Sequence, residues 1–269
     1  MTEARHAEPE FREEKVSLAG GDLIVLRGGS GRPLLVLHEE LGFPGWLWWN
    51  RELARERSLI IPLHPGFGRS PRREWILNVR DLACFYLWFI REQRLAPVDL
   101  LGFSFGGWIA AEMAAFAPTS VDRLVLVAPL GVAPPQGHLM DMFTLTARGY
   151  LRQTVLSAKA TPEFAALFGG ASTPEQFEAF EEARAEVARL AWQPYMRNPS
   201  LPHLLAGARQ LPTLLIWGQE DEVAPAACGE IYAGALRASR LTIFESCGHR
   251  PEIEQRERFI AQVRSFLAA

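Results

Sequence analysis

Short apolar runs recur along the chain, separated by stretches with helical spacing. Several runs are almost continuous in Leu, Ile and Val rather than alternating with polar residues. Such runs are typical of strands that are buried on both faces, as in a sheet covered by helices. The predicted strands lie at residues 23–26, 33–38, 59–63, 98–103, 124–127, 213–217 and 241–244.

Between these strands, apolar residues fall on single helical faces. One such face is expected between residues 82 and 90, and a second between residue 253 and the C-terminus. Strands that alternate with helices indicate a doubly wound, mostly parallel sheet. The fold class predicted from the pattern is therefore α/β. We see no internal repeat or flexible linker that would divide it.

One stretch breaks the alternation. Residues 133–207 contain no convincing strand, and helices are expected at 139–156 and 175–190. Thr173 is the expected N-cap of the second helix, with Pro174 in the first helical position and Gln176 reaching back to the cap. We therefore expect an α/β core formed by residues 1–132 and 208–269. The insertion at 133–207 would be a helical cap or lid over a site, or a separate partner-binding surface.

Composition narrows the possible partners. The 28 Lys and Arg residues against 31 Asp and Glu give a net charge of −3, which leaves no electrostatic footprint for nucleic acid. Residues 1–15 are charged and lack the apolar core of a signal peptide. The longest apolar runs fall short of the roughly 20 residues that cross a bilayer. We expect a cytoplasmic protein that acts on a small molecule, with no nucleic-acid or membrane partner. The oligomeric state is not predicted.

A glycine-flanked serine follows one predicted strand directly. Gly102, Ser104 and Gly106 form the pattern G-x-S-x-G between the strand at 98–103 and a predicted helix at 108–116. At so sharp a turn the serine takes a strained conformation, and a Cβ two residues to either side would clash. The hydroxyl then lies at a helix N-terminus, where free N–H groups favour developing negative charge. Ser104 is the candidate nucleophile, and an idle serine in a tight turn is the alternative.

A serine hydroxyl needs a base to become a nucleophile. His249 follows the predicted strand at 241–244, so its loop is expected at the same carboxyl edge of the sheet as Ser104. His38 and His64 also follow strands but precede the serine, and they are weaker candidates. His249 is therefore the candidate base, and a loop-stabilising histidine is the alternative.

The third member of a triad is expected after another strand. Asp221 follows the strand at 213–217 and is placed to hold His249 in the correct tautomer. Glu220 and Glu222 flank Asp221, so the alternative is a solvated acidic turn. The three cysteines show no metal-ligand spacing, and no metal or cofactor is expected.

These segments resemble the α/β-hydrolase superfamily, in its lid-bearing, esterase-like branch of serine hydrolases. The resemblance runs from Leu34 to the C-terminus. It is carried by GFSFGG at 102–107, WGQED at 217–221, GHRP at 248–251 and PGFGRS at 65–70. It implies the chain order nucleophile, acid, base. A serine nucleophile distinguishes the chain from relatives that use aspartate, such as haloalkane dehalogenases and epoxide hydrolases.

The chain departs from this family after the strand at 33–38. Relatives usually have His-Gly there, whereas this sequence has His38, Glu39 and Glu40. By matched position, the backbone N–H groups of Glu40 and Phe105 form the expected oxyanion hole. A carboxylate that pointed inward would oppose an oxyanion. The simplest hypothesis is that both glutamates point away or are paired. The others are that one binds a cationic group or acts as a second acid–base, or that the hole is unformed and the enzyme poor.

Aromatic and apolar residues suggest a substrate pocket. Three tryptophans lie at 46, 48 and 49, and the insertion carries Met and Phe side chains. They are suited to an apolar ligand, although Trp46 and Trp49 would also share a helical face and pack there. The candidate substrate-binding residues are His38, Glu39, Trp46, Met142 and Phe143.

The sequence therefore predicts a serine hydrolase that cleaves a carboxylic ester or related acyl bond of a small, mostly apolar substrate. One alternative is a hydrolase that cleaves a carbon–carbon bond in a vinylogous diketone. An alternative of another class is a ligand-binding receptor built on a hydrolase fold. The natural substrate is not predicted, because the pocket rather than the motifs decides it.

Overall fold

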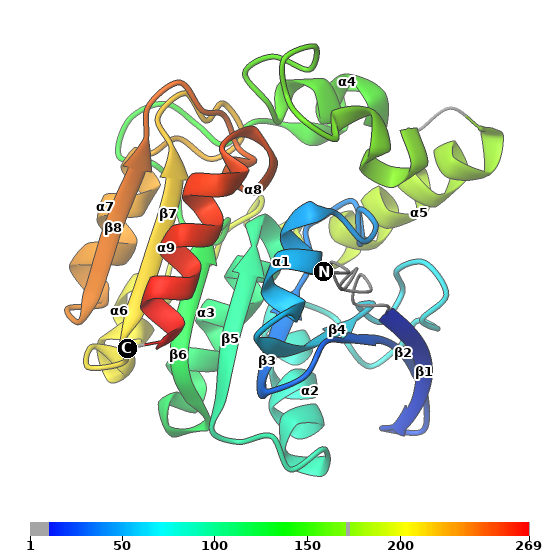
Figure 1. Cartoon of the computed structure of the whole chain (residues 1–269), viewed down its shortest axis with the longest axis vertical. Helices are drawn as coiled ribbons and strands as arrows, with labels where there is room; N and C mark the ends of the chain where they lie inside the picture. The colour runs from blue at the N-terminus through cyan, green and yellow to red at the C-terminus, as the bar shows by residue number, and fades with distance from the viewer. Residues whose placement is uncertain (1–10, 171–172, 269) are drawn as a thin grey trace, which may run out of the picture.

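The computed structural model describes residues 11–170 and 173–268. Its centre is a sheet in the order β1-β2-β4-β3-β5-β6-β7-β8, in which β1, β2 and β4 pair antiparallel and the remaining neighbours pair parallel (Figure 1). The strands are β1 (Phe11–Leu18), β2 (Gly21–Gly28), β3 (Arg32–Leu37), β4 (Arg57–Pro62), β5 (Val98–Phe103), β6 (Val121–Val127), β7 (Thr213–Gly218) and β8 (Ser239–Phe244). The predicted mostly parallel α/β sheet is confirmed.

Helices cover both faces of this sheet, as Figure 1 shows. On one face lie α1 (Trp48–Ala54) and α9 (Arg256–Ala268); on the other lie α2 (Val79–Glu92), α3 (Ser104–Phe116), α6 (Leu201–Leu204) and α7 (Ala227–Ala235). All six residues of β5 and of β7 are buried, which explains their unbroken apolar sequence. The expected face of α2 is buried as predicted, with Leu82, Phe85, Tyr86, Phe89 and Ile90 inside.

The strand β1 was not predicted. Its sequence FREEKVSL is charged, and it was interpreted only as part of a polar N-terminal segment. It pairs with β2 over its whole length and forms the edge of the sheet, with most of its residues exposed or half-buried. Charged side chains are a common feature of edge strands, because they discourage pairing with another chain.

The described part of the segment between β6 and β7 contains helices joined by irregular chain and no strand, and we call residues 133–207 the cap segment. It contains α4 (Ala147–Gln153) and α5 (Pro174–Ala191), and it ends with the short α6, which packs against α3 and α7 of the core. The N-terminal cap of α5 is as expected: Thr173 Oγ1 accepts the N–H of Gln176, and Gln176 Oε1 accepts the N–H of Thr173. Figure 1 places α4 and α5 beyond the carboxyl ends of the parallel strands.

The continuous helix expected at 139–156 is wrong. A 3₁₀ turn at Met142–Thr144 precedes the separate helix α4. Asp141 Oδ1 accepts the N–H of Phe143, and Thr146 Oγ1 accepts the N–H of Gly149. Short polar side chains that bond to nearby backbone N–H groups begin new helices instead of continuing old ones.

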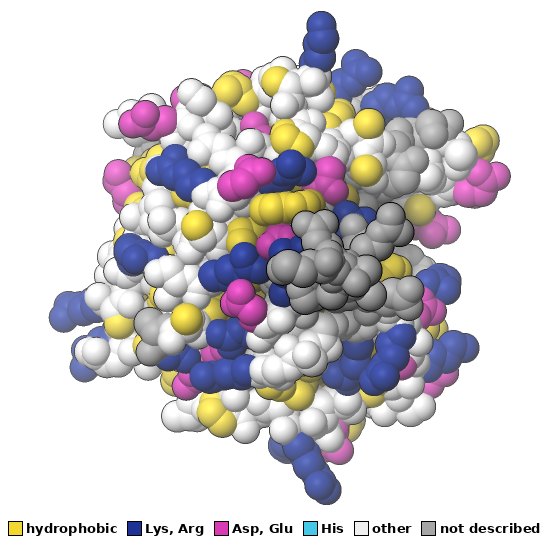
Figure 2. All heavy atoms as spheres, in the orientation of Figure 1, with side chains coloured by type: hydrophobic (Ala, Val, Ile, Leu, Met, Phe, Trp, Pro, Cys, Tyr) yellow, Lys and Arg dark blue, Asp and Glu magenta, His cyan; other side chains and the backbone are white. Residues whose placement is uncertain are grey.

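The surface agrees with the balanced composition. On the face in Figure 2, Lys and Arg side chains are interspersed with Asp and Glu. In the part of the chain that the structure describes, no helix is both long enough and apolar enough to span a bilayer.

Candidate active site

Ser104 lies on a strained turn between β5 and α3. Its φ is +46°, a value that residues with a side chain rarely adopt. A Cβ on Gly102 would lie 2.5 Å from the carbonyl oxygen of Gly106. A Cβ on Gly106 would lie 2.2 Å from that of Leu37. Both glycines are therefore needed for the turn. The absence of a side chain at Gly106 also lets the turn contact the backbone at the end of β3.

The structure brings Ser104, His249 and Asp221 into one hydrogen-bonded chain. His249 Nε2 is 2.8 Å from Ser104 Oγ, and His249 Nδ1 is 2.7 Å from Asp221 Oδ2. The other carboxylate oxygen of Asp221 accepts the N–H groups of Val223 and Ala224 at 2.8 and 2.9 Å. These bonds fix the carboxylate, so it accepts a hydrogen bond from Nδ1–H and leaves Nε2 free to accept one from the serine.

The environment makes His249 a stronger base. Burial lowers the pKa of its imidazole, but the Asp221 carboxylate, with a further contribution from Glu40, outweighs burial, and the net pKa is raised above 6.5. Ser104 and His249 are only 3% and 4% exposed. The pair therefore lies in a dry environment where electrostatic interactions are strong.

The loop after β3 forms a tight turn beside Ser104. The N–H of Gly42 donates to the carbonyl of Glu39 at 3.2 Å, and Gly42 has a φ of +100°. Glu40 occupies the second position of this turn, where the backbone N–H is not used by the turn itself. Phe105 lies in the first turn of α3, where N–H groups have no partner within the helix.

The side chains of His38 and His64 hold this loop through hydrogen bonds to its backbone carbonyls. His38 Nδ1 is 2.8 Å from the carbonyl of Glu39, and its Nε2 accepts the backbone N–H of His64 at 2.9 Å. His64 Nε2 is 3.0 Å from the carbonyl of His38 and its Nδ1 contacts the hydroxyl of Tyr86. Burial lowers the pKa of His38 to about 4, so both bonds suit a neutral ring. These contacts give His38 a structural role in holding the loop.

The hypothesis that both glutamates point away or are paired fails in part. Glu39 is paired, because the guanidinium of Arg250 donates to both of its carboxylate oxygens. Glu40 does not point away: it is fully buried and its Oε1 accepts the hydroxyl of Tyr150 at 2.7 Å. Its Oε2 has no hydrogen-bond partner among the described residues.

Arg250, Tyr150 and Glu252 are site residues that the sequence did not single out. Arg250 directly follows His249, and this adjacency was the available signal. Its Nε also donates to Thr154 Oγ1 at 2.6 Å, which ties the histidine loop to the cap segment. Glu252 lies 3.8 Å from Arg250, and burial raises the pKa of its carboxyl to about 8.

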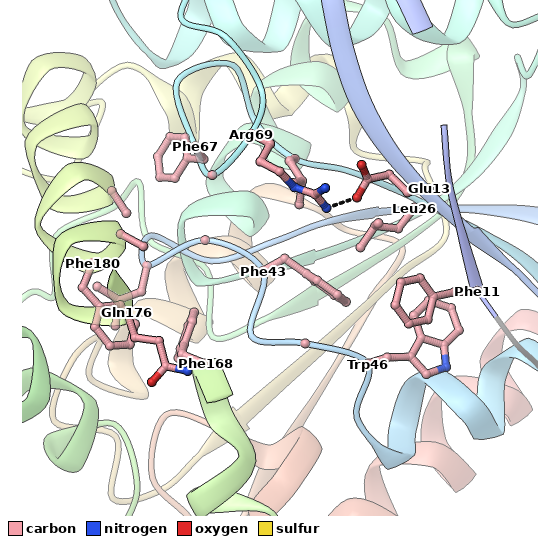
Figure 3. Close-up of a pocket in the computed structure, with 17 residues that line it drawn as sticks. Phe11, Glu13, Leu26, Phe43, Trp46, Phe67, Arg69, Phe168, Gln176 and Phe180 are labelled. Carbon is pink, nitrogen blue, oxygen red and sulfur yellow. Dashed lines mark hydrogen bonds and ion pairs between the residues drawn. The ribbon is translucent and has the colours of Figure 1, made fainter. Parts of the chain in front are cut away.

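An apolar cavity of about 340 Å³ is lined in part by the loop that follows β3 (Figure 3). Phe43 and Trp46 of this loop, Phe168 and Phe180 of the cap segment, and Phe11 of β1 contribute to its wall. At its rim Arg69 pairs with Glu13.

The two cap residues expected at the substrate pocket make their contacts within the cap. The N–H of Met142 donates to the hydroxyl of Tyr195, and the ring of Phe143 packs against Trp192 and Tyr195. Trp46 lies before helix α1 and stacks on Phe11, so the expected helical face shared with Trp49 is wrong.

The space beside Ser104 itself is nearly filled. A void of about 10 Å³ lies between Ser104, His249 and Arg250, which is room for about one water molecule. Two hydrogen bonds join the cap segment to loops of the site: the N–H of Phe168 donates to the carbonyl of Pro44, and the N–H of His249 donates to the carbonyl of Thr154. Within residues 11–170 and 173–268, no group of three His, Cys, Asp or Glu side chains is arranged to hold a metal.

The fold agrees with comparisons to known proteins. Residues 34–262 match the model of the alpha/beta hydrolase family. The chain is 30% identical to the 2-hydroxymuconate semialdehyde hydrolase of Pseudomonas sp. (strain CF600), over 97% of this chain and 95% of that protein. It is 30% identical to the pimeloyl-[acyl-carrier protein] methyl ester esterase of Neisseria meningitidis (strain H44/76), over 64% and 69%.

A crystal structure of a bacterial membrane phospholipase A superposes with a TM-score of 0.77 and 26% identity, over 96% of this chain and 86% of that one. The chain belongs to the alpha/beta hydrolase family. It is a hydrolase of the serine-hydrolase type.

Proposed function

We propose that the protein cleaves a carboxylic ester or a related acyl bond of a small substrate, with Ser104 as nucleophile, His249 as base and Asp221 as the acid that orients it. The observation that carries the proposal is the continuous hydrogen-bonded chain from Asp221 through His249 to Ser104, with the serine on a strained turn at a helix N-terminus. This arrangement is the one that activates a hydroxyl for acyl transfer.

The reaction proceeds in two stages. His249 Nε2 takes the hydroxyl proton while Ser104 Oγ attacks the carbonyl carbon. The resulting oxyanion accepts bonds from the N–H groups of Glu40 and Phe105. The leaving group departs with the proton from His249, and the acyl group stays on Ser104. Water then gives a proton to His249 and attacks the acyl carbon, and the acid leaves as the proton returns to Ser104.

The cap segment, residues 133–207, is proposed as a lid. Because the void beside Ser104 holds about one water molecule, a substrate enters only after the cap moves. The 340 Å³ cavity is lined mainly by aromatic and aliphatic side chains and borders the loop that carries Glu40. It is the proposed location for an apolar part of the substrate.

The second candidate function is cleavage of a carbon–carbon bond in a vinylogous diketone. It is favoured by the 30% identity, over nearly the whole chain, with a 2-hydroxymuconate semialdehyde hydrolase. The esterase candidate is favoured by the similarity to a methyl ester esterase and a phospholipase A. The same triad is compatible with either bond.

A panel of p-nitrophenyl esters, from acetate to decanoate, tests the proposal with the wild type and Ser104→Ala. We expect the wild type to turn over these esters and Ser104→Ala to show no turnover. The acyl chain length of the best substrate indicates the size of the apolar cavity. A parallel assay uses 2-hydroxymuconate semialdehyde. Turnover of this compound without turnover of any ester would replace the first candidate by the second. Tight ligand binding without any turnover would favour a receptor.

A further inference from the structure

The Glu40 carboxylate is only partly hydrogen-bonded in the interior of the protein. Its side chain is fully buried, and Tyr150 from the cap segment donates to Oε1. Oε2 is buried too, and it has no hydrogen-bond partner among the described residues. Buried polar atoms are nearly always paired, so an unpaired carboxylate oxygen calls for a partner that the closed protein does not supply.

This carboxylate faces the reacting groups. Glu40 follows β3 by three residues, at the point where the carbonyls of Leu37 and His38 press against the turn at Gly106. Burial raises the pKa of Glu40, but the charge of His249 and the hydroxyl of Ser104, together with Arg250 and Tyr150, outweigh burial and lower it. The carboxyl is therefore ionised at neutral pH, and it lies close enough to Ser104 and His249 to interact with both.

Arg250 offsets this charge only in part. Its guanidinium makes two hydrogen bonds to Glu39, so its charge is already matched by that carboxylate. The charge of Asp221 is matched once His249 has taken the proton of Ser104, which is the stage at which the oxyanion forms. In the described part of the site, Glu40 is thus left as the excess negative charge. An oxyanion that forms beside it is destabilised unless a positive or proton-donating group lies nearby.

We propose that the substrate supplies this group: the Ser104 site takes esters or amides that carry a protonated amine near the scissile bond, and Glu40 Oε2 binds the ammonium. The proposal rests on the serine-hydrolase function proposed above. An ammonium N–H satisfies the unpaired oxygen and offsets its charge when the oxyanion forms. An anionic substrate, such as a dienoate, is disfavoured at this site, because its carboxylate adds to the excess negative charge.

Matched esters test the proposal. On the acyl side, the p-nitrophenyl esters of β-alanine, butyric acid and succinic acid differ chiefly in an ammonium, a methyl or a carboxylate at one end. On the alcohol side, dimethylaminoethyl butyrate is paired with isopentyl butyrate. The measurement is kcat/KM at pH 7, corrected with Ser104→Ala, for the wild type and Glu40→Gln. Gln keeps the size of the side chain and an acceptor for Tyr150.

We expect the wild type to prefer the ammonium ester in at least one pair by about tenfold or more, and to use the succinate ester least. In Glu40→Gln that preference falls by about tenfold and the discrimination against succinate weakens. Glu182→Gln removes the same charge from an exposed position on α5 and leaves the preference as in the wild type. Tyr150→Phe keeps the carboxylate and therefore also keeps the preference, which separates charge recognition from damage to the loop.

Ser104-dependent turnover without an ammonium preference in either pair would overturn this proposal and leave the serine-hydrolase function standing. A preference of equal size in Glu40→Gln would also overturn it. If the wild type turns over none of the esters, the proposed cleavage of esters and related acyl bonds fails, and the ammonium proposal fails with it.

Discussion

The guanidinium of Arg250 binds the Glu39 carboxylate through two hydrogen bonds, and both side chains are almost completely buried. The two residues are 211 positions apart, so the pair joins the loop after β3 to the loop that carries His249. Two parallel N–H···O bonds fix both distance and orientation. The pair therefore sets the relative position of the proposed base and the proposed oxyanion hole.

Breaking this pair is expected to be costly. Arg250→Met leaves a buried, unpaired carboxylate and lowers the free energy of unfolding by about 3–5 kcal/mol. The double variant Arg250→Met with Glu39→Leu removes both charges and recovers most of the loss. Arg91→Met is the control, because its pair with Glu92 is exposed and contributes at most about 1 kcal/mol. Denaturant unfolding measures the stability of all three variants. An Arg250→Met protein as stable as the Arg91→Met control would contradict the prediction.

The two glycines Gly106 and Gly234 are expected to respond in opposite ways to alanine. Gly106→Ala places a Cβ 2.2 Å from the carbonyl oxygen of Leu37, so the variant loses about 1–3 kcal/mol and its kcat/KM falls as the oxyanion loop moves away. A Cβ on Gly234 in α7 has open space around it, and Gly234→Ala gains about 0.5 kcal/mol. Equal stabilities for the two variants would show that the turn has more room than the structure gives it.

The acid side of the pH profile depends on Glu40. Activity requires neutral His249, whose pKa is raised by Asp221 and Glu40 against the effects of burial and Arg250. Glu40→Gln removes one raising charge, so the pKa falls and the acid limb of kcat/KM moves to lower pH. Glu182→Gln, at an exposed site, is expected to leave the limb in place. An acid limb in Glu40→Gln that stays or moves to higher pH is incompatible with a carboxylate near His249.

Glu252 makes stability depend on pH in the opposite sense to an ordinary carboxylate. Burial raises its pKa from 4.5 to about 8, despite Arg250 at 3.8 Å. A raised pKa means that the folded state keeps the proton, so its contribution to stability is lost as pH rises from about 4.5 to 8. Glu252→Gln is uncharged throughout. Its Tm is expected to match the wild type at pH 4 and to exceed it by roughly 5–10 °C at pH 8.5. A constant Tm difference across this range would argue against the raised pKa.

The parts of the fold and site that were predictable depend on local signals. The G-x-S-x-G turn, the buried strands and the cap of α5 each lie within about ten residues, and each has a physical reason to take its form. The convergence of Ser104, His249 and Asp221 also followed, because all three come after parallel strands whose carboxyl ends meet at one edge of the sheet.

Other features depend on contacts between distant residues. The orientation of Glu40 is set by Tyr150, which is 110 positions away in a helix whose bounds were misjudged. The edge strand β1 has no apolar signal of its own and forms because β2 offers it a partner. The orientation of Glu40 and the existence of β1 could not be inferred from spacing or composition. Each depends on a contact with Tyr150 or β2 that forms only in the tertiary structure.

Labelling with a fluorophosphonate tests most directly whether Ser104 is an activated nucleophile. The wild type, Ser104→Ala and His249→Ala are incubated with the reagent and analysed by intact-protein mass spectrometry, followed by peptide mapping. The hydrogen-bonded chain predicts one adduct on Ser104 in the wild type, none in Ser104→Ala and at least a hundredfold slower labelling in His249→Ala. An unlabelled wild type, or an adduct that persists in Ser104→Ala, would contradict it.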